Sequence, residues 1–421
     1  MRLASSVDPG LLADPSVFAA GVPHSELARR RREAPVAWVE ERPLRRTGAG
    51  LALDVGGTGY WAVTRYWTIS DVGRDPETFS SAERGAFVPD PKSYQDLERT
   101  RRLLINMDEP QHKRIRGVVA AAFTPRVVAL LEGGLRAHAT SIVASAVERE
   151  EFDAVRDLAA ELPLRALADL FGMPREDRRL LFEWSNNVVG FDDPDYAAGD
   201  VEVYKRTFLD VFAYALELAR AKRRHPGDDL VSGLVEAGIG GEGNLSEEEY
   251  CHLWLLLAVA GNETTRHLLS GSLQALVEWP DERDRLIARP DLTRTAVEEL
   301  LRYVTPTMQF RRTATRDTEL DGQEIHAGDK VVLYYASANR DDAVFPEPDR
   351  LDLARHPNPH LAFGIGPHFC LGAHLARLEA AIMLDALRPH LASFELTGPV
   401  VRLQSTFMNG IKSMPARFAR A

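Results

Sequence analysis

One stretch of the sequence, His360 to Arg377 (HLAFGIGPHFCLGAHLAR), constrains this chain more than any other. Cys370, one of two cysteines in 421 residues, lies among glycines 364, 366 and 372. Glycines let a loop turn tightly and lie flat against a large planar ligand, because they have no Cβ. After the cysteine, apolar residues recur every three or four positions, which predicts an amphipathic helix that starts there.

A cysteine at a helix N-terminus is expected to ionise easily. Unpaired N–H groups and the positive end of the helix dipole lower a thiol pKa that is about 8.5 in free cysteine. The thiolate is the form that binds a metal. The alternative is a structural cysteine after a glycine-rich turn, since free cysteine also packs as a small hydrophobe.

Residues 363 to 372, Phe-Gly-x-Gly-x-His-x-Cys-x-Gly, resemble the haem-binding loop of the cytochrome P450 family. The resemblance implies haem b as cofactor and Cys370 as the thiolate ligand of its iron, where a thiolate favours O–O cleavage. It also implies that Phe363 and Gly364 pack against the porphyrin, and that His368 donates a hydrogen bond to a haem propionate. A loop histidine with its hydrogen bonds satisfied is the alternative for His368.

Further propionate partners follow from the same resemblance. His112 and Arg116 lie four residues apart after a helix start near Pro110, so they share one helix face and suit an anionic group. The family pattern gives this role to His112 and Arg116, and also to Arg312. An ordinary surface histidine and arginine are the alternative for the first two.

A long helix is predicted from Ser246, which forms a capping box with Glu249, to residue 278. Leu253 to Ala260 is apolar on all sides, so this part should run through the core. The next residues, Ala260-Gly261-Asn262-Glu263-Thr264-Thr265, place a glycine, a carboxylate and two hydroxyls in mid-helix. Such a departure from the helix pattern suggests function.

The departure matches the oxygen-binding helix of the P450 family. By that resemblance, Ala260 and Gly261 leave room for O2, Thr264 holds a water or the distal oxygen, and Glu263 relays protons from solvent. A Thr264 hydroxyl that bonds back to a helix carbonyl is a second interpretation, and it is compatible with the first.

Glu299 and Arg302 lie three apart, a spacing typical of a modest surface ion pair. The resemblance instead implies a buried network, with an arginine at 350 or 355, that braces the Cys370 loop. Residues 306 to 310 are expected to line the substrate pocket. Residues 407 to 410 are expected to form a turn between terminal strands that could reach this pocket.

The fold expected from these features is mainly α, a single cytochrome P450 domain over residues 1–421. Its small β-rich region is expected at roughly 35–70, 305–335 and 395–421. Within it, residues 35 to 65 alternate in the β manner, which predicts a hairpin with its turn at Val55 to Gly59. A phosphate-binding loop at these glycines is set aside, because the lysine and the following helix are missing.

The composition restricts the classes of binding partner and the cellular location that can be expected. The net charge of −11 argues against general nucleic-acid binding, and the basic run Arg29 to Arg32 is interpreted as a solvated face. Two cysteines indicate a reducing compartment. No secretory signal is visible, and the longest apolar run, Leu253 to Ala260, is far shorter than the roughly 20 residues of a membrane span. We therefore expect a cytoplasmic protein without membrane contact.

The resemblance implies a monooxygenase that inserts one atom of O2 into a C–H bond of an apolar small molecule, such as a steroid, terpenoid, fatty acid or natural-product intermediate. Residues 181–186 and 192–196 resemble a bacterial branch that acts on steroids, terpenoids and methyl-branched lipids. No nicotinamide or flavin fingerprint is present, so electrons are expected from a ferredoxin or flavodoxin partner. We expect that partner to dock near Lys113, Arg114 and Arg377.

Two alternatives stay open at this point. One is a haem-thiolate enzyme of natural-product biosynthesis that catalyses coupling, desaturation or epoxidation. The other, less favoured, is a haem protein that binds ligands without catalysis, which would not need the proton delivery suggested by Glu263 and Thr264.

Overall fold

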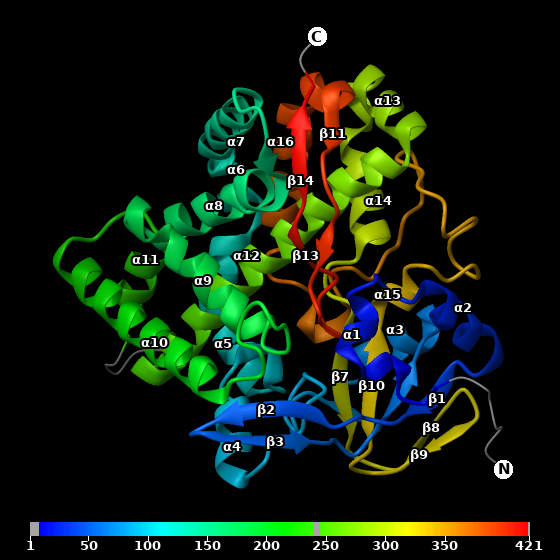
Figure 1. Ribbon diagram of the computed structural model, residues 1–421. Coiled ribbons are helices and arrows are strands. Elements are labelled where there is room, and N and C mark those ends of the chain that lie inside the picture. Colours follow the sequence, from blue (N-terminus) through cyan, green and yellow to red (C-terminus); the bar gives the residue numbers. More distant parts are fainter. Residues whose placement is uncertain (1–7, 240–244, 420–421) are drawn as a thin grey trace.

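The computed structural model describes residues 8–239 and 245–419, and most of them are helical (Figure 1). The glycines at residues 238–243 predict a flexible connector, and this segment lies mostly outside the described residues. The helices are α1 (Pro15–Phe18), α2 (His24–Glu33), α3 (Tyr66–Arg74), α4 (Tyr94–Thr100), α5 (Gln111–Ala120), α6 (Pro125–Leu130), α7 (Glu132–Val147), α8 (Glu161–Phe171), α9 (Arg178–Val189), α10 (Val201–Arg224), α11 (Leu230–Glu236), α12 (Glu247–Glu278), α13 (Pro280–Ala288), α14 (Thr293–Val304), α15 (Tyr335–Ala338) and α16 (Ala373–Leu387).

The strands are short and lie mostly in the predicted ranges. They are β1 (Val36–Val39), β2 (Leu44–Gly48), β3 (Leu51–Val55), β4 (Tyr60–Val63), β5 (Phe79–Ser80), β6 (Phe152–Asp153), β7 (Gln309–Ala314), β8 (Thr318–Leu320), β9 (Gln323–Ile325), β10 (Lys330–Tyr334), β11 (Phe394–Leu396), β12 (Val401–Arg402), β13 (Ile411–Ser413) and β14 (Pro415–Phe418). The prediction of a mainly α fold with a small β part is confirmed.

The helical part is built around α12, which contacts α8, α9, α10, α14 and α16 (Figure 1). The predicted capping box is present: the Ser246 hydroxyl accepts from the Glu249 N–H at 3.1 Å, and the Glu249 carboxylate accepts from the Ser246 N–H at 2.9 Å. Tyr250 to Leu255 are all buried, as expected for a helix surrounded by others. The predicted helix at 246–278 is thus confirmed to within one residue.

The largest sheet has the strand order β1-β4-β10-β7-β5, with β4 and β10 parallel and the other pairs antiparallel. The predicted pairing of β1 with β4 is confirmed, with Trp38 opposite Trp61. The predicted turn is wrong, however, because the intervening residues form a hairpin of their own from β2 and β3. Its turn is at Ala49 and Gly50, where φ is +49° and +77°. The glycines at 56–59 only lead from this hairpin into β4.

The basic run at the end of α2 departs from expectation. Arg30 and Arg31 are buried, with 5% and 6% exposure. The Arg31 guanidinium donates to the Ser337 hydroxyl at 2.9 Å and to the Arg340 carbonyl at 2.7 Å. The run is therefore not a solvated face, because two of its members are buried: Arg30 pairs with Glu26 within α2, and Arg31 joins α2 to the segment that follows β10.

Among the described residues, no helix taken singly has the length and apolarity to cross a bilayer; only the bent pair Gln111–Leu130 and Glu132–Val147 meets those requirements together.

Candidate functional site

The Cys370 loop is closed by its own backbone. The Cys370 N–H donates to the Phe363 carbonyl at 2.9 Å, and the Phe369 N–H donates to the Gly366 carbonyl at 3.0 Å. Gly364 and Gly366 have φ of +68° and +76°, values that side chains with a Cβ rarely adopt. A Cβ at Gly366 would also collide with the carbonyl of Gly73 on α3. Glycine at 366 is therefore needed both for the turn and for the packing of the loop on α3.

The pKa of Cys370 moves opposite to the predicted direction. Burial raises the pKa of the thiol, although the Gly372 N–H, Arg116 and Arg377 act the other way. The physical reason is that α16 begins only at Ala373, so helix-end stabilisation is outweighed by the cost of a buried thiolate. A cationic metal at the sulfur would supply the missing stabilisation, since a coordinating thiol is deprotonated.

The predicted propionate partners come together beside this loop. The rings of His112 and His368 lie 4.3 Å apart between centroids, and Arg116 donates to the Phe369 carbonyl at 2.7 Å. Burial, followed by Arg312, His112 and Arg116, lowers the pKa of His368 to about 2. Burial and Arg116 also lower the pKa of His112. Both rings are therefore neutral at pH 7, and the positive charge of the cluster comes from its arginines.

This cluster contains hydrogen-bond donors that are free to bind an added anionic group. His112 is 3% exposed, and its Nε2 is buried without a hydrogen-bond partner. Arg312 is 4% exposed, and among the described residues its guanidinium donates only to the Arg311 carbonyl, at 2.7 Å. Within residues 8–239 and 245–419, neither Arg116 nor Arg312 has a carboxylate partner. Buried donors left without acceptors are costly, so the cluster fits the two carboxylates of a haem. These residues would hold the propionates, and Cys370 would hold the iron.

The predicted oxygen-helix motif, residues 260 to 265 of α12, has two faces. Ala260 is exposed and Thr264 is half-buried, so both border open space. The Thr264 hydroxyl donates to the Ala260 carbonyl at 2.7 Å, which confirms the predicted back-bond. Gly261 faces elsewhere, since a Cβ there would lie 2.8 Å from Leu167 of α8. The glycine thus permits close packing of α12 on α8, while its role in making room for O2 stays a prediction.

Glu263 lies on a buried face of α12 and is 1% exposed. Its carboxylate accepts from the Ser185 hydroxyl at 2.7 Å, pairs with Arg266, and lies 3.2 Å from His267 Nε2. Burial alone would raise the pKa of Glu263, but Arg266 and His267 outweigh it and the pKa is lowered. Sequence reasoning missed these partners of Glu263. Ser185 lies in the motif at 181–186, but nothing in that motif shows that it reaches α12.

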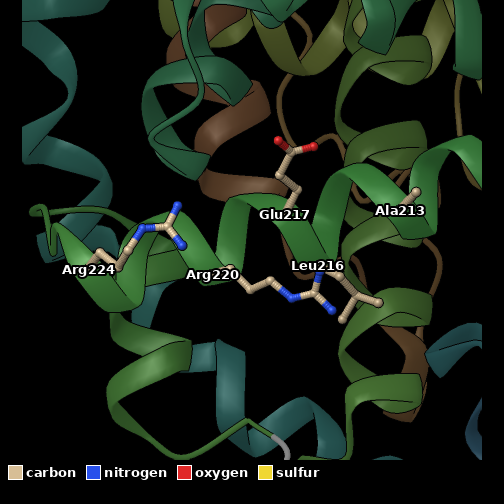
Figure 2. A pocket seen from close by; sticks show the side chains of 5 residues that line it. All are labelled: Ala213, Leu216, Glu217, Arg220 and Arg224. Atoms are coloured by element: carbon tan, nitrogen blue, oxygen red, sulfur yellow. The ribbon is translucent and has the colours of Figure 1, made fainter.

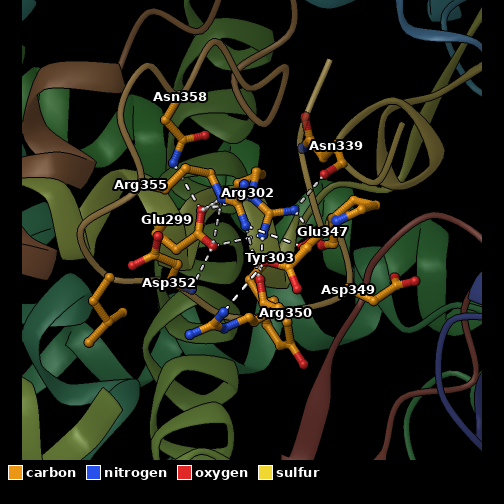
Figure 3. A network of polar contacts seen from close by, with 12 residues as sticks. Glu299, Arg302, Tyr303, Asn339, Glu347, Asp349, Arg350, Asp352, Arg355 and Asn358 are labelled. Atoms are coloured by element: carbon orange, nitrogen blue, oxygen red, sulfur yellow. Dashed lines mark hydrogen bonds and ion pairs between the residues drawn. The ribbon is translucent and has the colours of Figure 1, made fainter. Parts of the chain in front are cut away.

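The Glu299 network is buried and larger than an ordinary pair (Figure 3). Glu299 and Arg302 are fully buried and joined by hydrogen bonds of 2.7 and 2.8 Å. Arg355 donates to both Glu299 oxygens at 3.1 Å, and Asn358 donates at 3.0 Å. The predicted third member is therefore Arg355. Arg350 contributes its backbone carbonyl, which accepts from Arg302 and Arg355.

Three phenylalanines from separate segments meet at the predicted pocket wall. Phe310 of β7, Phe407 of the terminal turn and Phe87 have ring centroids 5.3 to 6.0 Å apart. The Met308 N–H donates to the Phe407 carbonyl at 2.9 Å, which joins the two segments predicted to line the pocket. Phe87 was not predicted, because nothing in its local sequence marks it.

A separate hollow of about 460 Å³ lies along α10 (Figure 2). It is bordered by one helix, on which Glu217 and Arg220 point in different directions. It includes none of the predicted site residues, and a single helix face does not enclose a ligand.

The fold and the cysteine-centred site define a haem-thiolate protein, and the chain belongs to the cytochrome P450 family. The family model "Cytochrome P450" matches residues 217–409. As a member, the protein is an oxidoreductase of the monooxygenase type with haem b as its cofactor.

Particular relatives cover almost the whole chain. The steroid C26-monooxygenase of Rhodococcus jostii (strain RHA1) is 38% identical over 97% of this chain and 84% of its own length. The methyl-branched lipid omega-hydroxylase of Mycobacterium tuberculosis (strain H37Rv) is 41% identical over 93% of this chain and 90% of its own. A Mycobacterium marinum cytochrome P450 in complex with pseudoionone superposes with a TM-score of 0.88, at 38% identity, covering 99% of this chain and 100% of the other.

Proposed function

We propose that this monooxygenase inserts one atom of O2 into a C–H bond of an apolar, branched or polycyclic molecule of the steroid, terpenoid or methyl-branched lipid kind. Electrons come from a ferredoxin or flavodoxin partner. The observation that carries the proposal is the cluster beside Cys370, in which His112 Nε2 has no partner and the guanidinium groups of Arg116 and Arg312 have no carboxylate partner among the described residues. It is a site for a dianionic group held next to a sulfur ligand.

Haem b, when bound, supplies the activation of O2. The chain supplies the protons, because the balanced reaction O2 + RH + 2e⁻ + 2H⁺ → ROH + H2O consumes two of them. Thr264 borders open space and can hand a proton across its hydroxyl. Glu263 is ionised and buried, so protons reach it through neighbours such as Ser185 and His267 rather than directly from solvent.

Replacing Thr264 with alanine should leave substrate affinity unchanged and lower the product formed per electron pair by about tenfold or more. The loss follows because positioned proton transfer contributes about 10²- to 10⁴-fold to a typical reaction. The missing product should reappear as hydrogen peroxide, from O2 + 2e⁻ + 2H⁺. Product and peroxide are measured together in one turnover assay.

Two matched variants control for helix damage. Thr264→Ser keeps a hydroxyl and should restore most coupling, whereas Thr265→Val changes the next, buried threonine and should stay coupled. Equal coupling in Thr264→Ala and the unmodified enzyme would remove Thr264 from the proposed proton path.

The substrate class is supported by the three phenylalanines at 87, 310 and 407, which offer an apolar aromatic wall. The named activities of the two monooxygenase relatives point the same way. A panel of steroids, terpenoids and methyl-branched fatty acids, titrated while the haem absorption band is recorded, identifies binders. Mass spectrometry of the products with labelled O2 then separates hydroxylation from coupling or desaturation, in which no labelled oxygen enters the product.

The electron partner is proposed to dock over the Cys370 side. Phe369, the residue before the cysteine, is 42% exposed, and Lys113 is exposed on the nearby α5. Arg114 and Arg377 are less available, since Arg114 pairs with Glu249 and Arg377 pairs with Glu298 at 2.7 Å. Among Lys113, Arg114 and Arg377, Lys113 is therefore the best residue at which to test the predicted docking surface.

Charge reversal in Lys113→Glu should slow reduction by a ferredoxin about tenfold at low salt, because electrostatic steering raises association rates by about 10- to 10³-fold. The difference should shrink at high salt, where exposed charges are screened. Lys205→Glu, which reverses the charge of an exposed lysine on α10, is the control. Equal reduction rates for both variants at low salt would place the docking surface elsewhere.

A further inference from the structure

A second cavity, of about 210 Å³, lies away from the oxygen-helix motif. It is formed where the start of α2, the last turns of α12, the end of α14 and the β12–β13 hairpin meet. Gln274, on its wall, is ten residues beyond Thr264, or about 15 Å along α12 at 1.5 Å per residue. Its polar and aromatic walls include His24, Gln274, Tyr303, Arg340 and Arg402.

Arg340 lines this cavity and carries a buried donor without a partner among the described residues. The residue is 5% exposed, and its guanidinium lies 4.0 Å above the ring of Tyr303. One terminal nitrogen pairs with Asp349 at 3.1 Å and the other donates to the Tyr303 carbonyl at 3.1 Å. Its Nε is buried and has no partner. The side chain is thus held rigidly with one N–H left over.

Arg402 brings a charge that no carboxylate neutralises at close range. Its terminal nitrogens donate to the side-chain oxygens of Asn409 at 3.1 Å and Gln274 at 2.9 Å, both of them neutral amides. Among the residues that the structure describes, Arg402 forms no ion pair. Glu278 is its nearest compensating charge, and the Glu278 carboxylate already accepts from Gln274 at 2.7 Å.

His24 lines the same cavity, and its Nδ1 is also buried without a partner among the described residues. Burial, then Arg340, Arg31 and Arg402, holds the pKa of His24 well below its ordinary value. A neutral imidazole can still donate from Nδ1 to an acceptor. The cavity is therefore lined by two residues with unused donors and by a guanidinium that has no ion-pair partner among the described residues, which together suit an anion with planar oxygens.

We propose that this cavity binds a compact organic carboxylate with a short apolar body. The carboxylate would face Arg402 and, once the atoms that cover these donors shift, accept from Arg340 Nε and His24, while Val22, Val304 and Ile411 offer apolar contacts. Phosphate fits less well, because a dianion would be repelled by Glu278 and by Asp349 and would not use the apolar walls. At about 210 Å³ the cavity is below the 300–1,000 Å³ typical of pockets for drug-sized ligands. The site is independent of the substrate proposed above.

The test is a calorimetric titration of the holoprotein with benzoate, with the haem absorption recorded in parallel. We expect saturable binding without a shift of the haem band, and at least tenfold weaker binding of benzyl alcohol, which has the same body without the charge. Arg402→Gln and, independently, His24→Leu should each weaken benzoate binding at least tenfold. Arg289→Gln, a surface arginine paired with Asp291, should leave it unchanged.

Three results would overturn the proposal. One is benzoate affinity that is unchanged in both Arg402→Gln and His24→Leu. Another is binding that always accompanies a shift of the haem band, which would place benzoate in the oxygen pocket. The third is inorganic phosphate binding as tightly as benzoate, which would contradict the carboxylate assignment.

Discussion

Cys370→Ser should abolish monooxygenase activity, and its reduced, carbon monoxide-bound form should lack the red-shifted absorption of a haem-thiolate protein. Serine is nearly isosteric, but its hydroxyl does not supply the soft, electron-rich sulfur ligand on which O–O cleavage depends. Folding should be preserved, because the loop is closed by backbone bonds from residue 370 to Phe363 that do not involve the sulfur.

The second cysteine is the matched control. Cys251 is buried in α12, and burial raises the pKa of its thiol to about 11, so it stays protonated and inert. Cys251→Ser should keep both the spectrum and the activity. Retention of the red-shifted band in Cys370→Ser, with far-UV circular dichroism unchanged, would disprove the assignment of the iron ligand.

Glu299→Gln should destabilise the protein by about 3–5 kcal/mol, the usual cost of breaking a buried ion pair. The change leaves the fully buried guanidinium of Arg302 and that of Arg355 without their shared counter-charge. Typical stabilities are about 5–15 kcal/mol, so most of the protein should lose haem or fail to fold at 37 °C. Thermal unfolding, followed by circular dichroism and by haem absorption, measures this effect.

Glu298, the residue before Glu299, provides the control variant for Glu299→Gln. Glu298 lies on the same helix as Glu299 and pairs with Arg377 and His360, but the Glu298 side chain is 28% exposed. Glu298→Gln should cost less than Glu299→Gln, because the Glu298 carboxylate is partly exposed and solvent screens its ion pairs. Equal melting temperatures for the two variants would show that the Glu299 network does not brace the Cys370 loop.

Much of the site could be predicted because its signals are local. The glycines around Cys370 are needed for positive φ at 364 and 366, and a residue's preference for that conformation is a property of the residue itself. The capping box at Ser246 is equally local, and the helix begins there. His112 and Arg116 share a face because the helix repeat places them there.

Other features could not be predicted, because they depend on which segments meet. The predicted turn at residues 55–59 was wrong: β1 and β4 do pair, but β2 and β3 fold back between them. Arg31 looks like a surface residue in the sequence, but it is buried and donates to the segment that follows β10. The pKa of Cys370 follows burial, which a sequence does not display, rather than its nearness to a helix start.

The sequence by itself determined the chemistry of this protein: a cysteine in a glycine-bent loop, a hydroxyl and a carboxylate in mid-helix, and the family to which those patterns belong. These patterns depend on residues that are close together in the sequence, because their spacing along the chain determines how they are arranged in a helix or a turn. Only the tertiary structure decided that Arg355 rather than Arg350 reaches Glu299, that Ser185 reaches Glu263, and that Arg340 and Arg402 meet in one cavity. Such contacts join segments tens of residues apart, and their partners are selected by packing.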